Sequence, residues 1–178
     1  MPGTPDPALG SRLLTVLVAT FPALTAVVLL YLGRRFKADL VQFAVGGGIG
    51  YAVTLLSIWA GVRVLFWRFA AEFPESLPLV LPIVVGVGTL FAGQWSVATL
   101  LFISYRLRTA AVWLFGVTWF TVYAFLFVGG EGSATFLLLI WLFGIGPMLF
   151  APLLVLAGGE FAIRHRETVA SGIKRVRK

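Results

Sequence analysis

The chain has 178 residues, of which 60% are hydrophobic and only 12% are charged. Water-soluble domains carry about 25% charged residues, so this composition excludes an ordinary soluble fold and predicts an all-α integral membrane protein. The sequence contains no cysteine, which excludes disulfides, thiolate metal sites and a cysteine nucleophile. The formal net charge of +7 raises the question of which side of a membrane the basic residues occupy.

A polar, proline-rich stretch, 1–11, opens the chain, and we expect it to be a short disordered leader. Five apolar runs follow, each about as long as the 20 residues that a spanning helix needs. They predict one membrane domain, 1–178, a bundle of about five transmembrane helices. The expected spans are 13–32, 40–62, 77–105, 109–128 and 134–157.

Proline and glycine mark expected distortions in these helices. Pro22 should kink the first span, and Gly146-Pro147 should break or kink the fifth. Residues 63–73 place apolar and charged side chains on opposite helical faces, which predicts a short interfacial helix. The alternative is that the second span simply continues out of the membrane.

The second span carries an unusual run of glycines between Phe43 and Thr54. Glycine inside a soluble helix costs roughly 1 kcal/mol against alanine, but in lipid it lets a neighbouring helix approach closely. We therefore expect the other helices to pack on this one. The helix-packing positions that we predict are Gly46, Gly47 and Gly50, with Gly86 and Gly93 in the third span.

The basic residues are distributed unevenly between the two ends of the predicted spans. With the N-terminus outside, eleven of the 14 lysines and arginines fall on the inner side. The positive-inside rule then predicts a multi-pass cell-membrane protein with a cytoplasmic C-terminus. The excess of arginine over lysine hints at a prokaryotic source.

The tail, 160–178, is basic. We expect it to contact anionic lipid headgroups, at about 1 kcal/mol per cation near the surface. The alternative is that it only fixes the topology. Its basic residues are Arg164, Arg166, Lys174, Arg175, Arg177 and Lys178.

No ionisable residue lies inside the predicted spans, whereas such a residue would be a functional candidate by default. This disfavours a proton relay and an intramembrane metalloprotease. The single histidine, His165, lies between two arginines in the tail, where a solvated side chain is expected. We therefore predict no catalytic residue, no metal site and no cofactor.

Polar and aromatic residues at membrane depth suggest a binding cavity. Its predicted lining is Gln94, Trp95, Tyr51 and Trp119, with a lipid headgroup, a sugar or an amphiphile as the ligand. The alternative is that Gln94 makes an ordinary interhelical hydrogen bond and that the aromatic rings fill space beside the glycines.

One family comparison rests on the order of basic residues, the stretch Phe43-Ala-Val-Gly-Gly-Gly-Ile-Gly50, and three further helices with both ends inside. This order resembles the GtrA-like proteins over Asp39 to about Glu160. The resemblance implies a small protein that translocates polyprenyl-linked sugars. The Asn-Arg-aromatic signature of that family stands here as Ser104-Tyr-Arg-Leu-Arg-Thr109, without the asparagine or the following aromatic.

The functional expectation is a non-catalytic membrane protein, a scaffold or subunit of a membrane assembly. Its expected partners are membrane lipids, further copies of itself or other membrane proteins, and not nucleic acid. The alternative function is a small carrier or flippase-like protein for a lipid-linked or amphipathic substrate.

Overall fold

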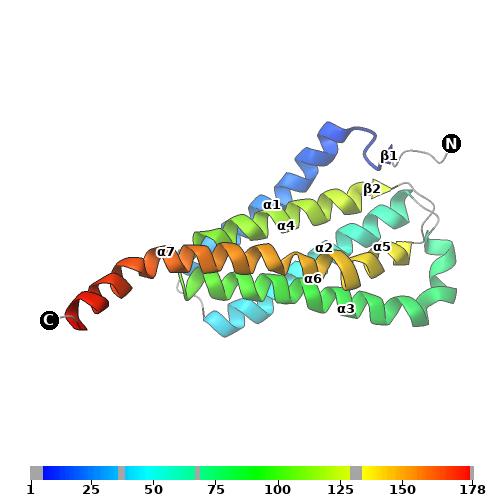
Figure 1. Cartoon of the computed structure of the whole chain (residues 1–178). Helices are drawn as coiled ribbons and strands as arrows, with labels where there is room; N and C mark the ends of the chain where they lie inside the picture. The colour runs from blue at the N-terminus through cyan, green and yellow to red at the C-terminus, as the bar shows by residue number, and fades with distance from the viewer. Residues whose placement is uncertain (1–5, 36–38, 67–68, 129–133, 177–178) are drawn as a thin grey trace.

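The computed structural model describes residues 6–35, 39–66, 69–128 and 134–176, and helices make up nearly all of them. Within that part of the chain, five helical segments are long and apolar enough to cross a membrane, which confirms the predicted all-α bundle (Figure 1). The first four are α1 (Arg12–Arg35), α2 (Leu40–Phe66), α3 (Phe69–Ile103) and α4 (Arg108–Leu126). The fifth is composite: α5 (Ala134–Ile140), η1 (Trp141–Ile145), α6 (Gly146–Met148) and α7 (Phe150–Val176).

The central helix is α4, and not the glycine-rich α2 that the sequence suggested. Over an apolar stretch of 18 residues in α4, 56% of residues are buried, against 22–33% over such stretches of the other four segments. The helix α2 packs mainly on α3, whereas α1 packs mainly on α4. The buried face of α1 is a stripe spaced three and four residues apart: Thr15, Ala19, Ala23, Ala26, Leu30 and Gly33. Small side chains in this stripe let α1 approach α4 closely, as glycines were expected to do in α2.

The fifth segment departs from α-helical geometry where the sequence predicted a break. The residues of η1 form a π-helix, and the N–H of Gly146 bonds to the carbonyl of Trp141. Pro147 has no N–H to donate, and a side chain at Gly146 would overlap that carbonyl. The predicted distortion at Gly146-Pro147 is therefore confirmed as a π-helical turn.

Residues 63–73 do not form a separate helix. The helix α2 continues to Phe66 and α3 begins at Phe69, with 67–68 outside the described residues. In Figure 1 the first turns of α3 stand across the end of the bundle before the helix turns to run along it. Pro74 and Pro78 lie in these turns, where each removes a backbone donor.

The described part of the N-terminal stretch is held against the bundle, contrary to the expectation of disorder. Strand β1 (Asp6–Pro7) pairs antiparallel with β2 (Phe127–Val128), directly after α4. The N–H of Ala8 continues the pairing to the carbonyl of Leu126 at 2.9 Å. This pairing satisfies a carbonyl at the C-terminal end of α4, which has no donor inside its own helix.

Candidate ligand cavity

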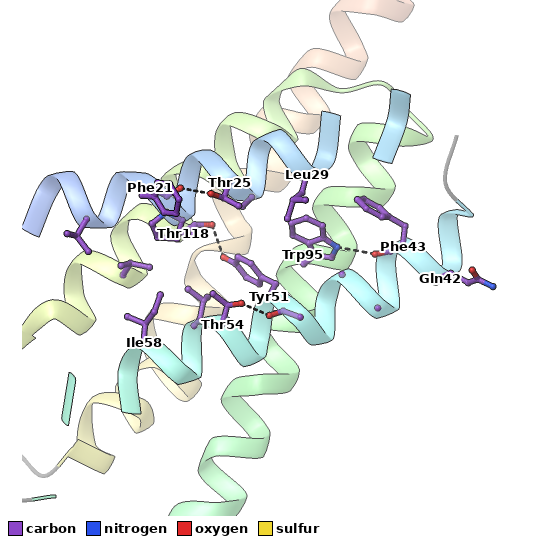
Figure 2. A pocket seen from close by; sticks show the side chains of 18 residues that line it. Phe21, Thr25, Leu29, Gln42, Phe43, Tyr51, Thr54, Ile58, Trp95 and Thr118 are labelled. Carbon is purple, nitrogen blue, oxygen red and sulfur yellow. Dashed lines mark hydrogen bonds between the residues drawn. The ribbon is translucent and has the colours of Figure 1, made fainter. Parts of the chain in front are cut away.

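An elongated cavity of about 920 Å³ lies between α1 and α2 (Figure 2). Its size is at the upper end of the roughly 300–1,000 Å³ typical of ligand sites. The α1 wall comprises Val18, Phe21, Pro22, Thr25, Ala26 and Leu29. The α2 wall comprises Gln42, Phe43, Gly46, Gly47, Gly50, Tyr51, Thr54, Leu55 and Ile58, while Trp95 of α3 and Thr118 and Val122 of α4 complete the lining.

The cavity exists because α1 and α2 meet at one end and pack on different helices beyond it. At the end where the chain passes from α1 to α2, Gly33 lies against the ring of Phe43, so closely that a Cβ would overlap it. Beyond this contact α1 turns to α4 and α2 turns to α3. Gly46 and Gly50 widen the gap further, since a Cβ at either position would meet no atom within 4 Å.

The floor of the cavity is buried and its polar groups are already paired. The hydroxyls of Tyr51 and Thr118 are hydrogen-bonded at 2.8 Å, and the indole N–H of Trp95 donates to the carbonyl of Phe43 at 3.3 Å. The rings of Tyr51 and Trp95 lie together, with their centroids 5.8 Å apart. Because these polar atoms are satisfied by the protein, the floor offers mainly apolar surface to a ligand.

The rim of the cavity is exposed at the side of the bundle. Thr25 bonds to the carbonyl of Phe21 at 2.9 Å, and Thr54 bonds to the carbonyl of Gly50 at 2.8 Å. Both threonines are exposed, one on each wall, and Phe21 on the α1 wall is exposed as well. An exposed rim over a buried floor means that the cavity opens sideways, toward the region that membrane lipid would fill.

The structure brings together half of the predicted cavity residues. Tyr51 and Trp95 line the cavity, whereas Gln94 and Trp119 do not. The side chain of Gln94 is fully buried, and neither its amide oxygen nor its amide nitrogen has a hydrogen-bond partner in the described structure. The indole of Trp119 instead donates to the hydroxyl of Thr20 at 3.2 Å and stacks on Tyr123.

The α1 wall was not anticipated from the sequence. Phe21, Pro22 and Thr25 are unremarkable residues of an apolar span, and no motif distinguishes them. One signal was available: small residues recur every three or four positions in α1, and this stripe marks the buried face of the helix. Phe21 and Thr25 lie outside the stripe and therefore on another face.

The glycines of the predicted packing surface divide into two groups. Gly47 packs on the Trp95 ring, and Gly48 approaches the carbonyl of Ala92, where a Cβ would lie 3.0 Å away. Gly46 and Gly50 contact no neighbouring helix of this chain and line the cavity instead. In α3, a Cβ at Gly86 would lie 3.1 Å from Leu142, whereas one at Gly93 would meet nothing within 4 Å.

Charged side chains gather at the two ends of the bundle. At the end where α1 finishes and α2 begins, the guanidinium of Arg34 lies over the ring of Phe102, 5.5 Å from its centroid. At the same end, Arg164 pairs with Glu160 and Arg166 is exposed. Lys174 and Arg175 belong to α7, but the structure does not describe their side chains, and Arg177 and Lys178 lie outside the described residues.

Arg63 is a buried cation that the sequence placed beyond the second span. It lies inside α2 and is 5% exposed. Its Nη1 donates to the carbonyl of Phe125 at 2.9 Å, and its guanidinium lies over the ring of Trp59, 5.8 Å from the centroid. The extra helical turn of α2 carries Arg63 into contact with the end of α4.

Among the described residues, no group of three or more His, Cys, Asp or Glu side chains could hold a metal ion. The fold and the cavity together define an all-α helical bundle that can span a membrane and has an apolar cavity open at its side. No protein-family model matches the chain, and no curated protein or solved structure matches it. The resemblance to the GtrA-like proteins stays a prediction from the sequence.

Proposed function

We propose that this protein is a non-catalytic, multi-pass membrane protein that binds the apolar chain of an amphipathic molecule between α1 and α2. The observation that carries the proposal is the 920 Å³ cavity with its buried floor and its open side. Its walls are almost entirely apolar, and the threonines on them bond to their own helices. A guest with a long apolar chain would replace bilayer contacts there without leaving a polar group unpaired.

The length of the cavity matches that of a lipid chain. The lined part of α1, from Val18 to Leu29, rises about 16 Å, and that of α2, from Gln42 to Ile58, about 24 Å. A lipid chain reaches through one leaflet of about 15 Å, so it can follow the lined part of α1 along its whole length.

The proposed location is the cell membrane of a prokaryote, with the N-terminus outside and the C-terminus in the cytoplasm. The separation of charge supports this orientation. The end proposed as cytoplasmic carries the exposed Arg34 of α1, Arg106 between α3 and α4, Arg108 of α4 and Arg166 of α7. Basic residues concentrate on the cytoplasmic side of membrane proteins.

The test of the proposed function is lipid retention by the purified protein. Gly50→Leu places a side chain in the cavity, whereas Gly61→Leu places one on the same helix outside it, with no atom within 4 Å of the new Cβ in either case. Native mass spectrometry in a mild detergent should find bound lipid on the wild type and on Gly61→Leu, and much less on Gly50→Leu. Equal retention by all three proteins would contradict the proposal.

A second candidate function, a scaffold or subunit of an assembly, is favoured by the length of α7. This helix runs along the bundle and then projects past the other helices (Figure 1). A basic helix in this position would contact anionic headgroups or an acidic partner. Deleting 173–178 should then weaken binding to anionic vesicles, and added salt should imitate the deletion because exposed charges are screened within about 8–10 Å. Unchanged vesicle binding would remove the support for this function.

A further inference from the structure

The cavity between α1 and α2 is not the same at its two ends, and this asymmetry bears on the ligand. Near Ile58 and Val18 the lining is aliphatic. At the other end the lining finishes with Gln42, which lies beyond Phe43 at the end of the row of labelled side chains in Figure 2. The cavity therefore has one end suited to the terminus of an apolar chain and another end suited to the polar atoms of an amphipathic ligand.

Gln42 is the polar lining residue whose side chain makes no hydrogen bond in the described structure. Its backbone N–H is used, since it donates to Oδ1 of Asp39 at 2.9 Å, and the Asp39 side chain thereby caps the start of α2. Its amide side chain is exposed and offers two donors and an acceptor. The hydroxyls of Tyr51 and Thr54 and the indole of Trp95 are all engaged within the protein.

Exposed arginines lie at the same end of the bundle as this amide. The contact of Gly33 with the Phe43 ring fixes the end of α1 against the start of α2. Arg35 follows Gly33 by two residues and Gln42 precedes Phe43 by one, so each lies within one helical turn of that contact along its own helix. Arg34 and Arg35 are both exposed, and one acidic residue, Asp39, directly precedes α2.

We infer that the cavity holds one chain of an anionic phospholipid of the surrounding bilayer, with its headgroup at the Gln42 end. This inference rests on the proposed function and names its ligand class. Gln42 donates to an ester or phosphate oxygen, and Arg34 and Arg35 balance the headgroup charge. The chain passes Gly46 and Gly50, which leave room for it, and reaches toward Ile58.

The experiment compares phosphatidylglycerol with phosphatidylcholine carrying the same chains. Each is added to the delipidated full-length protein in a mild detergent, and bound lipid is counted by native mass spectrometry. The wild type should prefer phosphatidylglycerol. Arg35→Gln should lower that preference about fivefold, the effect of one cation near a headgroup. Arg12→Gln, at the opposite end of α1, should leave it unchanged.

Three results separate the inference from the function on which it rests. Gln42→Leu should lower the retention of both lipids while the melting temperature stays that of the wild type. The wild type could retain the two lipids equally, or Arg12→Gln could lose as much preference as Arg35→Gln. Either result would overturn the assignment of an anionic headgroup but would leave the binding of the chain in place. Retention of neither lipid, or a Gly50→Leu variant that changes oligomeric state instead of lipid content, would overturn both.

Discussion

The carboxylate of Glu160 on α7 accepts two hydrogen bonds from Thr109 in the first turn of α4, from the backbone N–H at 2.9 Å and from the hydroxyl at 2.8 Å. Its other oxygen accepts the N–H of Arg108 at 3.1 Å. At the far end of the same helix, Arg63 of α2 donates to the carbonyl of Phe125. The most buried helix is thus held by an anion at its N-terminus and a cation at its C-terminus, as its dipole favours.

The first prediction concerns this N-terminal cap. Glu160→Ala should lower the free energy of unfolding by about 1–2 kcal/mol, because it leaves N–H groups at the start of α4 without an acceptor. Thermal unfolding in detergent would measure the loss, with Arg166→Ala on the exposed part of α7 as the control. Thr109→Val should add little once Glu160 is gone. A full additional loss in the double variant would mean that the two residues act independently.

The second prediction concerns the cap at the other end. Arg63→Met keeps much of the buried apolar stem but removes the hydrogen bond to Phe125, and should cost about 1.5–3 kcal/mol of stability, as for hydrogen bonds to charged groups. Arg12→Met changes an exposed arginine at the same end of the bundle and should have little effect. The melting temperatures of the two variants would show the difference. Equal melting temperatures would mean that Arg63 does not stabilise α4.

The spans could be predicted from the sequence because their length and apolarity depend on each helix alone. The central helix could not be predicted, because the burial of α4 depends on which other helices pack around it. Its capping residues are far away in the sequence: Glu160 is 51 positions from Thr109, and Arg63 is 62 positions from Phe125. The sequence at the two ends of α4 carries no signal of either residue. The burial of Arg63 was missed for a related reason. Whether Arg63 lies inside α2 depends on where that helix ends, and hydropathy locates a helix end only to within about one turn.

The glycine motif shows the same limit at the site. Gly46 and Gly50 form a small-residue pair in sequence, but whether such a pair faces a helix or a cavity depends on the course of the neighbouring helices. Here α1 diverges toward α4, so the pair faces open space, while Gly47 contacts Trp95. Tyr51 and Trp95 were predicted as cavity residues, and the α1 wall required the fold.

The third prediction separates the two kinds of glycine by stability. Gly47→Leu should destabilise the protein by about 1–3 kcal/mol or more, because the new side chain overlaps the buried Trp95 ring. Gly50→Leu should change the stability by less than about 0.5 kcal/mol, the usual effect at a position away from packed contacts. Unfolding of both variants under the same conditions, with Gly61→Leu as the control, would measure this. Equal destabilisation at 47 and 50 would place a neighbouring helix on Gly50.

The fourth prediction concerns orientation and uses the absence of native cysteine. Ser11 and Ser104 are exposed, and lie respectively just before α1 and just after α3, at opposite ends of the bundle. Because basic residues gather at the Ser104 end, Ser11→Cys should react with an impermeant thiol reagent in intact cells and Ser104→Cys should react only after lysis. The reverse pattern would invert the proposed orientation.

The last prediction asks whether Gln94 is a binding group. Its amide is fully buried, does not line the cavity, and has no hydrogen-bond partner in the described structure. A buried amide without a partner destabilises the folded state by about 1–3 kcal/mol, so Gln94→Met, with a side chain of similar length, should raise the melting temperature. Gln42→Met, at an exposed amide, should leave it unchanged. Lipid retention should be that of the wild type in Gln94→Met, because the proposed lipid chain would lie on Tyr51 and Trp95 and not on Gln94. A variant that is stable but retains no lipid would return Gln94 to the site and would show that the ligand enters the interior of the bundle, beyond the cavity between α1 and α2.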